Sequence, residues 1–218
     1  MRPVFALIVS TIAFGGVARA QTGAPAAAEK GYVEAVGQSS FGNVTSQNFG
    51  AEVGFTSAPH LQVFAEIGKT RDVATSALGS NAQRMAGALT AIDPTASFSV
   101  KEPVTFGTFG VRYLVPVSGK AQPYVLGGGG IAKVTPDVKF FAGGSDVTAN
   151  LQQAPYYVVL GSDLSGSSTK PMFVVGGGVA VPVWKQLVFD FQVRFGRILA
   201  EDEAIMVGRA GLGIGIRF

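Results

Sequence analysis

The chain contains no cysteine, one histidine and few charged residues, and each of these shortages excludes a class of protein. Without cysteine it has neither disulfides nor thiolate ligands, so another feature must hold the folded chain together. Because His60 is the sole histidine, a transition-metal site is not expected. Lys and Arg number 17 and Asp and Glu 14, a balance that does not predict binding of nucleic acid. We therefore expect no cofactor, no metal site and no nucleic-acid partner.

Long apolar runs are also missing, although hydrophobic residues make up 47% of the chain. Beyond residue 20, no run reaches the roughly 18 apolar residues that predict a membrane-spanning helix. The longest candidate, Phe173–Trp184, is interrupted by three glycines and Pro182. The apolar residues are instead spread by alternation, which favours strands over helices.

The first 20 residues have the features of a secretory signal peptide. Arg2 supplies the positive start, Val4–Val17 the apolar core, and Ala18-Arg19-Ala20 the small-residue cleavage site. We therefore expect residues 1–20 to be removed and residues 21–218 to form the exported domain.

Eight later segments alternate between apolar and polar residues with the two-residue period of a β-strand. The last is the clearest, because its large apolar residues share one side while glycine and arginine dominate the other. The glycine-rich fifth segment does not define its own facing; if Lys133 points inward, Tyr124 and Leu126 point outward. The expected strands are Gly31–Ser40, Gln47–Thr56, Leu61–Arg71, Thr105–Val115, Gln122–Val134, Met172–Val181, Leu187–Leu199 and Ile205–Phe218.

The connections between these segments alternate in character, as they do in outer-membrane barrels with short periplasmic turns and longer outer loops. Within the second outer connection, Ser80–Ile92 has a composition that favours a short helix. Trp184, Tyr113 and Tyr124 are expected near the periplasmic rim. The long or polar connections are Gly42–Ser46, Asp72–Pro103, Thr135–Lys170 and Ala200–Ala204, and the tight turns are Ser57–His60, Pro116–Ala121 and Pro182–Gln186.

The sequence therefore predicts an all-β fold: an eight-stranded antiparallel up-and-down transmembrane β-barrel with short periplasmic turns and longer extracellular loops. This pattern resembles the small outer-membrane barrels of the OmpA transmembrane-domain, OmpX and opacity-protein type, without a peptidoglycan-binding domain. The resemblance implies the outer membrane of a Gram-negative bacterium, with its lipids and lipopolysaccharide as surroundings. The alternating Ile214, Ile216 and terminal Phe218 resemble the assembly signal that the outer-membrane insertion machinery reads.

If the polar sides of these strands face inward, charged side chains of both signs lie in the barrel lumen. A barrel of this size has an interior just wide enough for side chains to fill, so these charges must pair. We favour a structural ion-pair network, with a narrow or gated pore as the alternative. The predicted network comprises Glu52, Glu66, Arg112, Asp190, Arg194 and Arg209.

Other features of the sequence carry weaker signals. The runs Gly127–Gly130 and Gly176–Gly178 lack the Lys-Ser/Thr of a phosphate loop. They are better explained as small residues at places where strands bend or where the interior has little volume.

The acidic residues 201–203 either bind a divalent cation or keep a short loop solvated. The aromatic loop residues either cap the barrel mouth or form a contact surface; they are Phe140, Phe141, Tyr156 and Tyr157.

The leading functional hypothesis is a non-enzymatic outer-membrane protein whose loops contact the environment or a host. Catalysis is not expected, because His60 lies in a predicted periplasmic turn, away from any outer-rim substrate. One alternative is a narrow pore for small solutes or hydrophobic ligands. Another is a soluble periplasmic, lipocalin-like barrel, which requires the opposite facing of every strand.

Overall fold

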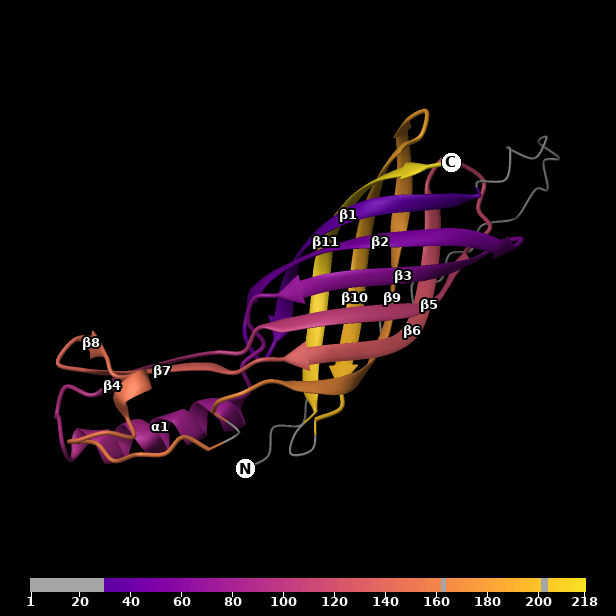
Figure 1. Ribbon diagram of the computed structural model, residues 1–218. Coiled ribbons are helices and arrows are strands. Elements are labelled where there is room, and N and C mark those ends of the chain that lie inside the picture. The colour runs from indigo at the N-terminus through magenta and orange to yellow at the C-terminus, as the bar shows by residue number, and fades with distance from the viewer. Residues whose placement is uncertain (1–29, 162–163, 201–203) are drawn as a thin grey trace, which may run out of the picture.

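The computed structural model describes residues 30–161, 164–200 and 204–218, and eight of its strands close into one antiparallel barrel (Figure 1). Neighbours around the barrel follow the order β1-β11-β10-β9-β6-β5-β3-β2, so each strand pairs with its neighbour in the chain and the first pairs with the last. The predicted fold class is confirmed. The barrel strands are β1 (Gly31–Gly42), β2 (Ser46–Ala58), β3 (Leu61–Thr70), β5 (Val104–Leu114), β6 (Gln122–Val134), β9 (Ser168–Trp184), β10 (Leu187–Ile198) and β11 (Ile205–Arg217).

The two longest connections fold together into an extension that projects beyond one end of the barrel (Figure 1). The β3–β5 connection contributes α1 (Ser76–Thr90) and β4 (Ser97–Lys101). The β6–β9 connection contributes β7 (Asp137–Ala142), β8 (Ser145–Asp146) and the 3₁₀ turn η1 (Thr148–Asn150). Strands β4, β7 and β8 form a separate antiparallel sheet. Among the described residues, no helix is long and apolar enough to span a membrane.

The extension has a hydrophobic core of its own. The helix α1 begins after Thr75, whose side chain accepts a hydrogen bond from the Leu78 backbone N–H at 3.2 Å. The buried side of α1 has the spacing of one helical face, and it packs against β7 and the segment that follows it. The core residues are Leu78, Ala82, Ala86, Leu89, Val138, Phe140, Ala142, Val147, Leu151 and Leu164.

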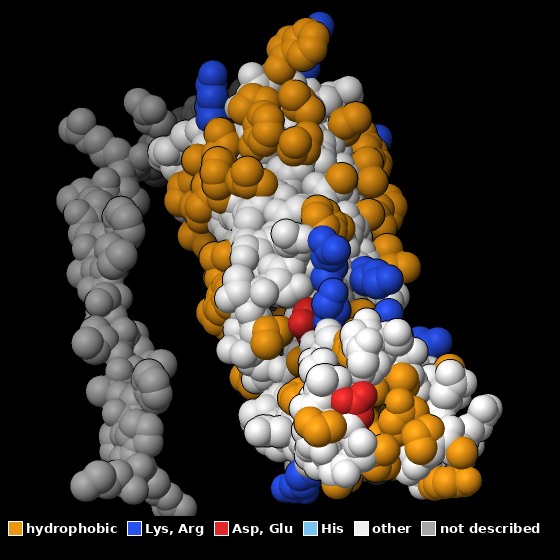
Figure 2. Space-filling model, turned by 90° about the vertical axis from the view of Figure 1, so that its left-hand side faces the viewer, with side chains coloured by type: hydrophobic (Ala, Val, Ile, Leu, Met, Phe, Trp, Pro, Cys, Tyr) orange, Lys and Arg blue, Asp and Glu red, His pale blue; other side chains and the backbone are white. Residues whose placement is uncertain are grey.

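The barrel places large apolar side chains outside and polar ones inside. Phe109 is 70% exposed and Ile67 64%, whereas Glu52 and Arg112 are each 1% exposed. Figure 2 shows the apolar side chains spread over the visible barrel wall. A soluble lipocalin-like barrel requires the reverse facing, so that alternative is wrong.

The fifth expected strand, β6, faces opposite to the Lys133-inward interpretation. Tyr124 and Leu126 are buried in the lumen, and Val125 and Lys133 are exposed on the outside. The predicted placement of Tyr124 at the rim is therefore wrong. The cause lies inside the lumen, where the Tyr124 hydroxyl donates to Asp190 and its ring packs against the Arg112 guanidinium at 3.9 Å. Because glycine has no side chain, the four glycines of β6 do not alternate between apolar and polar residues, so the sequence does not show which side of this strand faces the lumen.

Candidate functional site: the barrel lumen and the projecting extension

Strand register places like charges side by side inside the barrel. Glu34, Glu52 and Glu66 stand directly opposite one another on β1, β2 and β3. Arg194 and Arg209 likewise stand opposite each other on β10 and β11. Like charges at such positions destabilise a sheet, so each row depends on counter-charges reached across the lumen.

Arg194 joins two carboxylates of the opposing acidic row. Its Nη1 atom lies 2.5 Å from Glu52 Oε2 and 2.9 Å from Glu66 Oε2, and its side chain is fully buried. Arg209 forms a two-pronged contact with Glu66, at 2.7 Å and 3.2 Å. The two hydrogen bonds from Arg209 are charge-assisted, and such bonds are among the stronger ones in proteins.

Arg112 forms the second centre of the network, in the half of β5 that lies away from the extension. Its Nη2 atom lies 2.9 Å from Glu52 Oε1 and 3.1 Å from Asp190 Oδ2. The rings of Tyr32 and Tyr124 lie 4.4 Å and 3.9 Å from its guanidinium carbon. The structure thus brings together all six residues proposed for the lumen network, together with Glu34, Tyr32 and Tyr124.

Apolar layers lie on either side of these charges. Toward the end that carries the extension, the lumen holds a buried cluster that includes Phe106, Met172, Ile198 and Ile205. Toward the other end, Phe64, Tyr124, Leu126, Val174, Ala180 and Val188 form a second cluster. Charged pairs between two apolar layers favour a rigid scaffold over an aqueous channel.

A search of solved structures found similar barrels. Neisserial surface protein A aligns with 86% of this chain and 96% of its own, at 12% identity and a TM-score of 0.53. A major outer membrane protein from Thermus thermophilus aligns with 88% of this chain and 100% of its own, at 14% identity and a TM-score of 0.55. The chain has the fold of the small outer-membrane β-barrels. A scan against protein-family models found no match, and a search of curated protein sequences found none either.

This outer-membrane fold defines which end of the barrel is which. Its short turns face the periplasm and its longer loops face outward. The turns at His60, Lys120 and Lys185 are therefore periplasmic, and the extension is extracellular. The apolar outer wall is the surface that contacts the outer membrane.

The four aromatic loop residues lie in the extracellular extension and do not form one surface. Phe140 is fully buried in the extension core, and Tyr156 packs partly against that core. Phe141 is half-buried, and Tyr157 is 74% exposed. Phe140 therefore neither caps the barrel mouth nor presents an external contact, because its side chain on β7 is buried in the core shared with α1.

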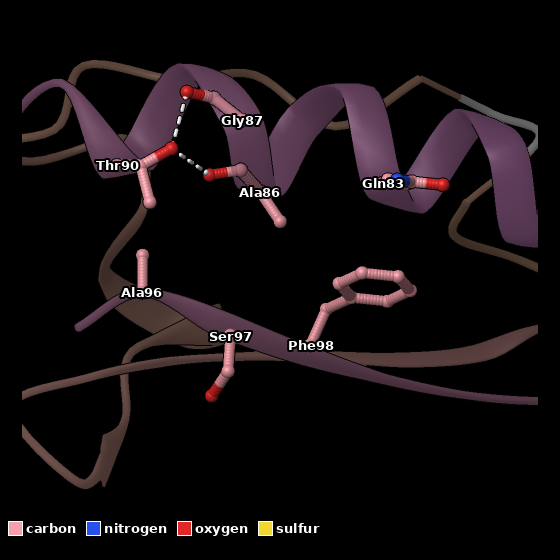
Figure 3. A pocket seen from close by; sticks show the side chains of 7 residues that line it. All are labelled: Gln83, Ala86, Gly87, Thr90, Ala96, Ser97 and Phe98. Atoms are coloured by element: carbon pink, nitrogen blue, oxygen red, sulfur yellow. Dashed lines mark hydrogen bonds between the residues drawn. The ribbon is translucent and has the colours of Figure 1, made fainter. Parts of the chain in front are cut away.

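A shallow apolar groove on the extension was not predicted from the sequence. It lies between α1 and β4 and has a volume of about 380 Å³ (Figure 3). Thr90 turns its hydroxyl back onto α1, donating to the carbonyls of Ala86 and Gly87. The lining therefore offers mostly apolar atoms; it consists of Gln83, Ala86, Gly87, Thr90, Ala96, Ser97 and Phe98.

Two acidic residues join the ends of the β3–β5 connection where the extension leaves the barrel. Asp72 Oδ1 accepts hydrogen bonds from the backbone N–H groups of Ala74 and Glu102, at 3.0 Å and 2.9 Å. The Val73 N–H donates to the Glu102 carbonyl at 3.0 Å. Burial, reinforced by the Asp72 charge and opposed by a hydrogen bond from the Thr75 backbone, raises the pKa of Glu102 to about 7.

This raised pKa predicts that the extension loosens as the pH rises. Below the ordinary pKa of 4.5, Glu102 is neutral and its burial costs no charge desolvation. As the pH rises through about 7, the buried carboxyl becomes charged and the extension loses stability. We expect a cost on the order of 1–2 kcal/mol at pH 8.5 after solvent screening. Protease cleavage within the extension should therefore rise with pH relative to Glu102→Gln measured at the same pH. A constant ratio across this range would contradict the prediction.

The C-terminal residue closes the seam between the first and last strands. The Phe218 carbonyl accepts hydrogen bonds from Lys30 and Gly31 at 2.7 Å and 3.0 Å, and its N–H donates to the Gly31 carbonyl at 3.0 Å. Its ring packs edge-on against Phe55, with 6.4 Å between centroids. Ile214 and Ile216 lie on the same outer face and are about half exposed, at 52% and 51%.

Deletion of Phe218 is expected to reduce the folded barrel in the outer-membrane fraction severalfold, because it removes seam hydrogen bonds and an exposed aromatic end together. The measurement compares boiled and unboiled samples on a denaturing gel. Phe173→Ala serves as the control, since it removes an exposed aromatic ring from the wall without touching the seam. Equal amounts of folded protein in both variants would contradict a special role for the terminus.

Two other predicted features lie outside the described residues: the signal peptide and the acidic cluster at 201–203. In the part of the chain that the structure describes, no group of three or more His, Cys, Asp and Glu side chains has an arrangement suited to a metal ion.

Proposed function

We propose that this protein is a non-enzymatic surface protein whose barrel anchors the folded extension in the outer membrane and presents it to the environment or a host. The observation that carries this proposal is the separate core of the extension, in which Leu89 and Phe140 are fully buried. A connection that served only to link two strands would need no such core. The groove beside Phe98 and the exposed Tyr157 supply apolar contact area on the same unit.

The lumen supports a scaffold role for the barrel. Arg194 and Arg209 are fully buried among carboxylates, and such pairs hold opposite walls of the barrel together. A narrow pore for small solutes remains the alternative, and planar-bilayer recordings separate the two. Unitary currents from the purified barrel that change with Asp190→Asn would favour the pore.

We also propose that Phe218, Ile216 and Ile214 are read by the insertion machinery during assembly, and that outer-membrane lipids and lipopolysaccharide surround the wall. The support for the first is the exposed, alternating placement of these side chains at the end of β11. The support for the second is the apolar outer wall.

The absence of native cysteine allows a direct test of surface display. Tyr157→Cys on intact cells should react with a membrane-impermeant maleimide, because Tyr157 is 74% exposed on the extension. Lys120→Cys, in the turn between β5 and β6, should react only after the outer membrane is permeabilised. Labelling of Lys120→Cys but not Tyr157→Cys on intact cells would overturn the proposal.

A further inference from the structure

The exposed charges on the outer wall of the barrel are all positive, and all lie near the same end of the barrel. In the described barrel strands, all four acidic residues point into the lumen, and the exposed outward charges are Lys69, Lys133 and Arg197. Each of these cations is the residue before the last of its strand, on β3, β6 and β10. These three strands all end on the extracellular side, so the outward charges mark the outer edge of the apolar wall.

Two of these cations are brought together by strand register. Lys69 stands opposite Thr105, and Thr105 stands opposite Lys133, on the neighbouring strands β3, β5 and β6. Two strand spacings separate the lysines, so their backbones lie about 10 Å apart with an exposed threonine hydroxyl between them. No ion pair of Lys69 or Lys133 is found among the described residues.

The next row of residues, on the membrane side of Lys69, Thr105 and Lys133, is apolar and has a gap at its centre. Ile67 stands opposite Gly107, which stands opposite Ile131, and the two isoleucines are 64% and 60% exposed. A methyl group added at Gly107 would meet nothing within 4 Å, so a gap remains between the two isoleucine side chains. A Lys-Thr-Lys row thus borders an Ile-Gly-Ile row on the same three strands.

The nearby segments add further positive charge. Arg71 and Lys101 are exposed where the β3–β5 connection leaves and rejoins the barrel, and Asp137 stands opposite Lys101 in the β4–β7 register. Figure 2 shows Lys and Arg side chains gathered where the barrel wall meets the extension, with few acidic ones beside them. Cations at a membrane boundary attract anionic headgroups and lose strength with added salt.

We propose that Lys69, Thr105 and Lys133 form a binding site for the phosphate of a lipid in the outer leaflet, with an acyl chain of that lipid in the gap over Gly107. Each lysine acts as a point charge toward the phosphate oxygens, and the threonine hydroxyl donates a hydrogen bond between them. The ligand class is a phosphorylated lipid, because an anionic group and apolar chains are both matched; bisphosphorylated lipid A represents it in the test. This inference rests on the proposed function, in which the barrel lies in the outer membrane and displays the extension outside the cell.

The test measures binding of bisphosphorylated lipid A to the purified full chain in neutral detergent by native mass spectrometry. Lys69→Gln/Lys133→Gln should bind about 30-fold more weakly than the unsubstituted protein. The matched control, Lys30→Gln/Lys120→Gln, removes the same charge from the periplasmic end and should bind within about twofold of the unsubstituted protein. A heat-dependent gel shift establishes that each variant is folded.

Three results would overturn the proposal. The first is that Lys69→Gln/Lys133→Gln binds lipid A as tightly as the unsubstituted protein does. The second is that the unsubstituted protein binds dephosphorylated lipid A as tightly as the bisphosphorylated form. The third is full competition by inorganic phosphate, which would mean that the site binds a free anion. The maleimide labelling of Tyr157→Cys reports orientation without any lipid. Failure of the lipid site therefore leaves the display proposal standing, and reversed labelling identifies failure of the orientation itself.

Discussion

Arg194→Met is expected to lower the free energy of unfolding by about 3–5 kcal/mol, the usual cost of removing one partner from a buried ion pair. Arg194 lies within 2.9 Å of carboxylate oxygens from both Glu52 and Glu66. Methionine fills part of the volume but leaves those two acids facing each other across β2 and β3. Urea unfolding of the detergent-folded barrel measures the effect.

The matched control for this substitution lies three residues along the same strand. Arg197→Met removes an identical side chain from the outer face, where Arg197 is exposed, and should change stability by about 0.5 kcal/mol or less. Adding Glu52→Gln to Arg194→Met should recover part of the loss, because it removes one uncompensated carboxylate. If Arg194→Met and Arg197→Met unfold at the same urea concentration, the lumen network does not stabilise the barrel.

Gly130→Ala is expected to destabilise the barrel by about 2–3 kcal/mol, although alanine normally suits a strand better than glycine. A Cβ atom at Gly130 would lie 2.0 Å from the Gly107 carbonyl oxygen, and one at Gly128 would lie 2.3 Å from that of Phe109. The obstacle is backbone rather than a movable side chain, so β5 and β6 would have to separate.

The neighbouring Gly127 provides a close control. A Cβ atom there would lie 3.9 Å from its nearest neighbour, the Val174 carbonyl oxygen, so Gly127→Ala should be tolerated within about 0.5 kcal/mol. The comparison uses the temperature at which the heat-dependent gel shift occurs in each variant. Equal transition temperatures for Gly127→Ala and Gly130→Ala would show that the strands adjust without cost.

Much of the barrel follows from local alternation. The predicted strand is Leu187–Leu199, in which apolar residues recur at every second position from Leu187 to Phe195. The observed β10, Leu187–Ile198, ends one residue earlier and has Asp190, Gln192 and Arg194 inside. The same period placed Glu52 and Glu66 on the polar side of their strands, and that side lies in the lumen. Prolines and polar connections then predicted the ends of the strands to within a few residues of the observed ends.

Alternation does not determine contacts between distant segments. The facing of β6 depends on Tyr124 meeting Arg112 and Asp190, which lie on other strands. The helix composition at Ser80–Ile92 was visible, but the start of α1 at Ser76 depends on the Thr75 cap. The pairing of β4 with β7 joins two different connections, so neither segment alone predicts it.

The sequence by itself determined the number of barrel strands and the two faces of most of them, because side chains alternate strictly along a strand. Only the tertiary structure decided which acid meets which arginine, since those contacts cross the lumen between strands far apart in the chain. It also decided that Lys69, Thr105 and Lys133 form one row, because that row arises from the register of three strands. Closure of the barrel converts these separate periodic strands into one charged interior and one cationic outer edge.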